Sequence, residues 1–240
     1  MNLLSFVLAF SLVLPTAAQE KTDDDTLVRR LLAEDLGTRS FSFSQVVESS
    51  SGKKVIPFDK TNPSHAEVLK QIKAAASNAI QTLNLADSPI KNLRRINEAS
   101  RYFEEVILLE IAKHPDLTST IPKNAQGKTQ RTGYPDIRIE HIPSKTVFYL
   151  DPKLYEKTSR ASSLRTFYFE PKTRTMKIQD DAVHLLLGIN HNGVDGDWSF
   201  LGWELVDLSK FKVRLKAEFQ GSNRDLYRRS NIIESSTLAK

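Results

Sequence analysis

The spacing of apolar residues predicts two long helices in the first half of the chain. Apolar side chains recur every three or four positions over residues 66–85 and again over residues 93–113, which is the pattern of an amphipathic helix. Asn62-Pro63-Ser64 precedes the first of these segments and is typical of a helix start. A shorter segment, residues 26–36, has the same spacing, whereas no clear pattern covers residues 40–62.

Beyond residue 133 the pattern becomes that of β-strands. Residues 135–142 and residues 146–150 are predicted strands, and Pro143-Ser144-Lys145 between them is a turn. The second strand has apolar residues on both faces, as in the centre of a sheet. The remaining expected elements are a loop over 117–133, a short helix over 155–163, a hairpin of 164–169 with 175–178, a strand or helix over 180–190, and strands over 203–208 and 211–219. This order of elements predicts one α/β domain with a mixed central sheet flanked by helices.

The N-terminus has the pattern of a secretory signal peptide. Residues 3–14 form an apolar run, Pro15 ends it, and Thr16-Ala17-Ala18 supplies the small residues of a cleavage site, although no Lys or Arg precedes the run. A buried first helix or strand is the alternative. We therefore expect a secreted or periplasmic protein with no membrane span in its mature chain. Its expected parts are a signal peptide over residues 1–18, an N-terminal extension over residues 19–62 and the main domain over residues 63–240.

Composition narrows the classes of function. The chain has 240 residues, of which 40% are hydrophobic and 26% charged, and these values are typical of a globular protein. With 34 Lys and Arg against 29 Asp and Glu, the net charge is +5, which suits an anionic partner better than a cationic one. The chain contains no Cys, and this excludes disulfide scaffolds, Cys-ligated zinc, iron–sulfur clusters and thiol nucleophiles. It also lacks the glycine motifs of phosphate-binding loops, the G-x-S-x-G elbow and the H-E-x-x-H zinc motif.

Three residues around the predicted hairpin carry the candidate chemistry. Asp136 stands at the start of the first strand, and Asp151 and Lys153 stand at the end of the second. Residues i and i+2 of a strand point to the same face, and the turn returns Asp136 to the side of Asp151. Two converging carboxylates suit a hard divalent cation, with Mg²⁺ the usual candidate. A lysine beside that ion would favour deprotonation of a water molecule and stabilise a phosphoryl oxyanion. The alternative is a structural ion pair of Lys153 with either aspartate.

These residues resemble the motif of the PD-(D/E)xK nuclease superfamily, which has the restriction-endonuclease-like fold. Pro135-Asp136, a hairpin and Asp151-Pro152-Lys153 are similar to its pattern in the Asp-x-Lys form, and the resemblance covers roughly residues 93–219. Members commonly carry a further acidic residue on the preceding helix, and Phe103-Glu104 matches this feature, with Glu110 as the second choice. The resemblance implies DNA as the substrate, Mg²⁺ or Mn²⁺ as the cofactor, Lys153 as the water-activating residue, and Asp136, Asp151 and Glu104 as metal ligands.

The distribution of charge agrees with a nucleic-acid substrate. Between Ile121 and Ile178 the chain carries 12 Lys and Arg against 5 Asp and Glu, and positive charge around an acidic metal site suits a phosphate backbone. Two short motifs compete with the main one, because Pro115-Asp116 is a second Pro-Asp pair and Glu170-Pro171-Lys172 is a second acidic-x-Lys triplet. His184 lies in an apolar run and is expected to be a core residue.

The sequence therefore predicts an exported, metal-dependent endonuclease that hydrolyses phosphodiester bonds of DNA. Two alternatives stay open. One is a non-enzymatic exported binding protein on a degenerate nuclease-like scaffold, and the other is a cytoplasmic type II restriction endonuclease whose first residues are not a signal. A monomer and a homodimer are both compatible with the sequence.

Overall fold

The computed structural model describes residues 17–34, 36–163, 167–216, 218 and 220–234, and the chain divides into two compact units. The smaller unit comprises Met1–Ser40 and Arg214–Lys240, and its described helices are α1 (Ala17–Ala33) and the short α5 (Asn223–Leu226). α1 contains most of the helix expected over residues 26–36. Residues 1–16 of the predicted signal peptide lie outside the described residues. Among the described helices, none has the length and hydropathy required to span a bilayer.

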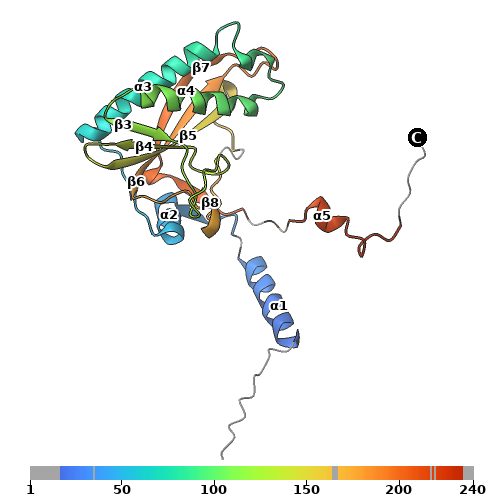
Figure 1. Ribbon diagram of the computed structural model, residues 1–240. Helices are drawn as coiled ribbons and strands as arrows, with labels where there is room; N and C mark the ends of the chain where they lie inside the picture. Colours follow the sequence, from blue (N-terminus) through green and yellow to red (C-terminus); the bar gives the residue numbers. More distant parts are fainter. Residues whose placement is uncertain (1–16, 35, 164–166, 217, 219, 235–240) are drawn as a thin grey trace, which may run out of the picture. The chain divides into compact units, whose positions relative to one another are not determined.

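The larger unit, Phe41–Val213, is built on a six-stranded mixed sheet (Figure 1). Its strands are β2 (Val55–Ile56), β3 (Leu117–Thr120), β4 (Ile137–His141), β5 (Thr146–Glu156), β6 (Ala182–His191) and β7 (Phe200–Asp207). The order across the sheet is β2-β6-β5-β4-β3, and β7 also pairs with β6. β6 is parallel to β5 and β2, whereas the β3–β4, β4–β5 and β6–β7 pairs are antiparallel. The predicted mixed central sheet is therefore confirmed.

Two helices, α3 (Pro63–Leu83) and α4 (Ser100–Ala112), cover one face of this sheet (Figure 1). The Asn62 side chain accepts a hydrogen bond from the backbone N–H of Ser64, and Pro63 opens the first turn, which confirms the predicted helix start. α4 is shorter than predicted because Ile96–Ala99 form a 3₁₀ turn before it. The core beneath the two helices includes Val68, Ile72, Phe103, Ile107, Ile137, Phe148 and Leu185.

A shorter helix, α2 (Phe43–Ser51), packs on the other face. Phe43 and Val47 of α2 are fully buried against a second core cluster that contains Tyr149 of β5 and Ala182 of β6. β1 (Ser40–Ser42) and β8 (Lys212–Arg214) pair to form a separate two-stranded sheet. Helices on both faces complete the α/β architecture expected from the sequence. Residues 41–62 of the predicted N-terminal extension lie in the larger unit, and the predicted boundaries at residues 18 and 62 stay predictions.

Two predictions of local structure are wrong. The expected loop over 117–133 begins with β3, an edge strand that pairs with β4. The expected hairpin between 164 and 178 is not a pair of strands in its described part, because residues 167–172 are irregular and Thr173–Thr175 form a 3₁₀ turn. The alternating aromatic residues that suggested a strand belong instead to a cluster of packed aromatic rings. Phe167 and Phe169 pack edge-on against Phe43, with ring centroids 5.7 Å and 5.9 Å away.

Two further elements differ in extent. β5 continues to Glu156 and is followed by a 3₁₀ turn, Lys157–Ser159, where a short helix was expected. β8 covers three residues of the strand expected over 211–219. The segment over 180–190, for which strand and helix were both open, forms β6 in the middle of the sheet.

Candidate active site

Strand alternation places Asp136, Asp151 and Lys153 on one face of the sheet, away from α3 and α4. Ile137 of β4 and Leu150 of β5 are register partners, and both are buried in the core beneath those helices. Asp136 and Asp151 are their neighbours in the chain, so the two carboxylates point to the opposite face. Lys153 follows Asp151 by two residues and shares that face. The structure therefore brings these three predicted site residues together.

Lys153 bridges the two aspartates. Its Nζ donates a hydrogen bond to Asp136 Oδ2 at 3.2 Å and lies 2.6 Å from Asp151 Oδ2. The lysine side chain is 26% exposed, whereas the side chains of Asp136 and Asp151 are 11% and 1% exposed. Burial acts to lower the pKa of Lys153, but the charges of Asp151 and Asp136 outweigh burial and the pKa is raised. Lys153 is therefore an ammonium ion at neutral pH.

Asp151 is a buried carboxylate with free acceptor capacity. Its Oδ2 lies 2.6 Å from the ammonium nitrogen of Lys153, whereas its Oδ1 has no hydrogen-bond partner among the described residues. Burial, and then repulsion from Asp136, raises the pKa of Asp151 well above its usual range, and Lys153 acts in the opposite direction. A buried acceptor oxygen without a donor, beside a second carboxylate, is what a hard divalent cation requires. Asp136 and Asp151 thus fit such an ion.

Glu104 belongs to α4, which covers the other face of the sheet, yet the charges of Asp136 and Lys153 act on its carboxylate. Its side chain is 14% exposed, and its Oε2 lies 3.7 Å from Nη1 of Arg131. Burial, and then repulsion from Asp136, raises the pKa of Glu104 to about 7, although Arg131 acts to lower it. Among the described residues, Glu104 and the two aspartates do not form a set whose ligand atoms all lie within 4.8 Å of one another. Glu110, the second choice, pairs with Lys113 at the end of the same helix, at 2.5 Å.

Lys177 is a site residue that the sequence pattern did not single out. It is 1% exposed, and its Nζ donates to the backbone oxygen of Gln130 at 3.2 Å. Burial lowers the pKa of Lys177, while Asp136, Asp151 and Glu104 act to raise it. A second buried cation therefore faces the same three carboxylates. The available signal was its place between Met176 and Ile178, because a lysine in an apolar segment is buried only when charged groups compensate it.

A neutral Tyr–His pair lies next to the aspartates. Tyr134 Oη and His184 Nδ1 are 2.7 Å apart, and both residues are buried. Burial lowers the pKa of His184 to about 3 and, together with the charge of Asp151, raises the pKa of Tyr134 well above its usual range. The His184 ring is therefore neutral, and one hydrogen bond joins its Nδ1 to the hydroxyl of Tyr134. His184 is the core residue that the sequence led us to expect.

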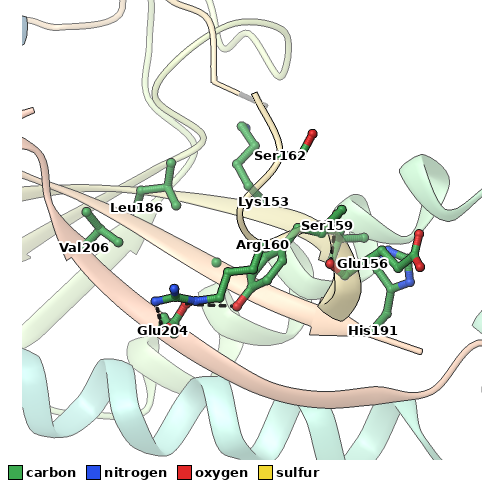
Figure 2. A pocket seen from close by; sticks show the side chains of 12 residues that line it. Lys153, Glu156, Ser159, Arg160, Ser162, Leu186, His191, Glu204 and Val206 are labelled. Atoms are coloured by element: carbon green, nitrogen blue, oxygen red, sulfur yellow. Dashed lines mark hydrogen bonds and ion pairs between the residues drawn. The ribbon is translucent and has the colours of Figure 1, made fainter. Parts of the chain in front are cut away.

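An open pocket of about 540 Å³ adjoins Lys153 on the β5–β6–β7 side (Figure 2). Arg160 binds both oxygens of Glu204 at 2.9 Å and 2.8 Å, and the hydroxyl of Tyr155 donates to the same carboxylate at 3.0 Å. Figure 2 shows Arg160 and Glu204 in the pocket beside Lys153. Its volume falls in the range of small-ligand sites.

The two competing motifs lie elsewhere. Glu170 and Lys172 form a surface ion pair at 2.7 Å with side chains 70% and 63% exposed, so solvent screens their charges. Asp116 of the second Pro-Asp pair directly precedes β3, whose first residue pairs with His141 at the end of β4 opposite to Asp136. Neither motif has the burial that distinguishes Asp136 and Asp151.

Comparison with known proteins gives two matches. The model of the Type II restriction enzyme MjaV family matches residues 36–230. The protein named Type II restriction enzyme MjaV, from Methanocaldococcus jannaschii, is 30% identical to this chain in an alignment of 224 positions, which covers 89% of this chain and 95% of that protein. The family match spans the hairpin that carries Asp136, Asp151 and Lys153.

Proposed function

Because the chain belongs to the Type II restriction enzyme MjaV family, a family of restriction endonucleases, we propose that it hydrolyses phosphodiester bonds of DNA at Asp136, Asp151 and Lys153. The observation that carries the proposal is the position of Lys153, whose ammonium group bridges two carboxylates on one face of the sheet. The order Pro-Asp, hairpin, Asp-x-Lys supports assignment of the site to the PD-(D/E)xK superfamily.

The site is proposed to require Mg²⁺, with Mn²⁺ as a substitute. Asp136 and Asp151 would hold the ion, and Glu104 would contribute from α4. When bound, the ion supplies Lewis acidity toward a phosphate oxygen and a hydroxide nucleophile. The buried Asp151 Oδ1, which has no hydrogen-bond partner among the described residues, supports this assignment.

Lys153 is proposed to act as a cation. Its raised pKa keeps the ammonium group charged, so it donates hydrogen bonds to the attacking water and to a phosphate oxygen. Donation orients the water and stabilises the negative charge that develops on the phosphate. Its neighbours Asp136 and Asp151 hold it in place until the substrate and the ion take up those contacts.

The pocket beside Lys153 supports a path for the DNA strand. Lys153 lines this pocket (Figure 2) and also contacts Asp136 and Asp151. A nucleotide next to the scissile phosphate would lie over the β5–β7 side, where Arg160 and Tyr155 present polar groups. The excess of Lys and Arg between residues 121 and 178 would supply the contacts to phosphate groups.

Family membership favours a restriction endonuclease of the cytoplasm over an exported nuclease. Secretion stays a prediction, and its signal segment falls mostly outside the described residues. Mass spectrometry of the protein from its own cells tests it, since cleavage near Ala18 would remove the first residues. A homodimer likewise stays a prediction, tested by light scattering.

The direct test is cleavage of plasmid and synthetic duplex DNA by the purified chain with and without Mg²⁺. Asp136→Ala, Asp151→Asn and Lys153→Ala are expected to reduce the cleavage rate by about 100-fold or more. The matched controls are Glu170→Gln and Lys172→Ala, which alter the exposed acidic-x-Lys pair and should leave the rate unchanged.

Variants that lose cleavage activity are expected to keep their affinity for DNA. Asp136→Ala is expected to bind DNA as the unaltered chain does, with affinity that falls as salt rises. If the unaltered chain and Asp136→Ala are equally inert on DNA and RNA with every divalent ion tested, the non-enzymatic binding protein replaces the nuclease. If Lys172→Ala loses activity and Lys153→Ala retains it, the site lies at the competing motif.

A further inference from the structure

We propose that Glu67, His114 and Asp116 form a second metal site, selective for Zn²⁺ or a similar transition metal, apart from the catalytic carboxylates. Nothing in the proposed nuclease chemistry uses these residues. Each offers a ligand atom, and the three atoms lie within 4.8 Å of one another. The site joins the first turns of α3, the segment after α4 and the residue before β3.

The spacing of the donors fits zinc coordination. Nε2 of His114 lies 3.2 Å from Oε1 of Glu67. Two donors on a tetrahedral zinc ion, each about 2.0–2.1 Å from the metal, are about 3.3 Å apart. One small shift of the Asp116 side chain, which is exposed, then completes a three-ligand set with water in the fourth position.

A second histidine orients the glutamate. Nε2 of His141 lies 3.2 Å from Oε2 of Glu67, the oxygen that His114 does not contact. On the other side of the ring, Nδ1 of His141 lies 2.7 Å from Oγ of Ser144 and 3.3 Å from its backbone N–H, so His141 bridges Ser144 and the glutamate. A ligating carboxylate held by such an outer hydrogen bond is typical of metal sites. His141 is therefore a positioning residue.

His114 would coordinate through Nε2, the nitrogen that faces Glu67, while its Nδ1 lies 3.3 Å from the backbone nitrogen of Asp116. Metal binding requires that Nε2 carry no proton. The imidazole donor distinguishes this site from the all-oxygen set of Asp136 and Asp151, since imidazole suits Zn²⁺ and carboxylates suit Mg²⁺.

The place of the cluster indicates a structural role. His141 is the last residue of β4 and Asp136 directly precedes the first, so the two ends are about 17 Å apart along the strand. A metal here would tie α3, the end of α4 and the β3–β4 pair together without contact with the scissile phosphate. Binding to the folded chain alone should raise its melting temperature.

The test uses full-length Asp136→Ala protein, stripped with EDTA, so that the catalytic carboxylates contribute little. Calorimetric titration with Zn²⁺ is expected to show one ion per chain, and Co²⁺ should give the visible absorption of a low-coordinate nitrogen and oxygen site. At about 100 times the dissociation constant, Zn²⁺ should raise the melting temperature by about 5–10 °C. Adding His114→Ala, Asp116→Asn or Glu67→Gln should weaken binding at least tenfold and remove that rise.

The matched control is Asp87→Asn, which changes another exposed aspartate and should leave zinc binding intact. Circular dichroism identifies a variant that fails to fold. If a variant at Glu67 or His114 does so, the zinc affinity of Asp116→Asn, which changes an exposed residue, tests the proposal. Absence of zinc binding in the Asp136→Ala protein would overturn the proposal. So would equal zinc affinity in the chains with and without Asp116→Asn and His114→Ala. These readouts do not involve DNA cleavage, so failure here leaves the proposed nuclease function standing.

Discussion

The ammonium group of Lys153 lies 2.6 Å from Asp151 Oδ2, while Oδ1 of that buried carboxylate has no hydrogen-bond partner among the described residues. Burial and the charge of Asp136 raise its pKa, which means that the ionised form is costly in the folded chain. An arrangement of this kind favours ligand binding over stability, a trade that functional sites commonly show.

Asp151→Asn is expected to stabilise the metal-free chain at pH 8 by on the order of 1–3 kcal/mol while it removes cleavage. The folded pKa of Asp151 lies above the unfolded value, so ionisation costs stability progressively as pH rises from the unfolded pKa through the folded one. The gain should therefore shrink toward zero near pH 4. Urea unfolding in EDTA at pH 4, 6 and 8 measures it. Glu170→Gln, at an exposed position, should change nothing, and an equal loss of stability at pH 4 and pH 8 in Asp151→Asn would contradict the account.

Glu104→Gln is expected to flatten the pH dependence of the Mg²⁺ requirement. Because burial and Asp136 raise the pKa of Glu104 to about 7, protons compete with the metal below that pH, and the half-saturating Mg²⁺ concentration should rise by up to about tenfold per pH unit. Cleavage rates measured against Mg²⁺ concentration at pH 6, 7 and 8 give the half-saturating concentration at each pH, and hence the slope of its logarithm against pH. Glu110→Gln is the matched control, since that carboxylate pairs with Lys113. A slope that flattens in Glu110→Gln and persists in Glu104→Gln would make Glu110 the helix ligand.

Lys177→Met is expected to lower the half-saturating Mg²⁺ concentration by about fivefold, which corresponds to about 1 kcal/mol of removed repulsion. The buried ammonium of Lys177 faces the carboxylates that would hold the ion, so its charge opposes metal binding. Lys177→Arg keeps the positive charge and should leave the half-saturating Mg²⁺ concentration unchanged. Lys172→Met removes the charge of an exposed lysine and serves as the control. An unchanged or increased Mg²⁺ requirement in Lys177→Met would show that Lys177 does not act on the metal site.

Tyr134→Phe should destabilise the fold by about 1–3 kcal/mol, because it leaves Nδ1 of the buried His184 without its hydrogen-bond partner. Nε2 of the same ring already has no hydrogen-bond partner, so the ring would lose its remaining one. Chemical denaturation measures the change. Tyr227→Phe removes a hydroxyl from a side chain that is 70% exposed and is expected to be neutral. Equal stability of the two variants would indicate that the Tyr134 hydroxyl contributes nothing to the core.

The elements that local chemistry determines could be predicted from the sequence. The cap at Asn62 and the apolar stripe behind it define α3, and the turn over residues 143–145 with its flanking alternation defines the β4–β5 hairpin. That hairpin places Asp136, Asp151 and Lys153 by strand geometry alone. Pro152 is accommodated because the pairing of β4 with β5 ends at Leu150, which leaves only β6 beside it.

What could not be predicted depends on contacts between distant segments. Lys177 interacts with the site carboxylates although it lies 24 positions after Lys153 in the chain. The spacing of apolar residues gives no information about a contact between segments so far apart. β3 is short and polar, and only its pairing with β4 makes it a strand. The alternating aromatics near residue 167 imitate a strand because a ring cluster and a pleated sheet both favour such residues.

The connections of β5 carry a consequence for the order in which the chain folds. β5 reaches β4 through a turn over residues 142–145, but it reaches its parallel partner β6 only after residues 157–181 have passed. Closure of the short turn costs less entropy, so we expect the hairpin to form first. Asp136 and Asp151 then meet while water still screens their charges. Lys177 arrives later, with the segment that leads into β6, and it enters the site as the last strands remove that water.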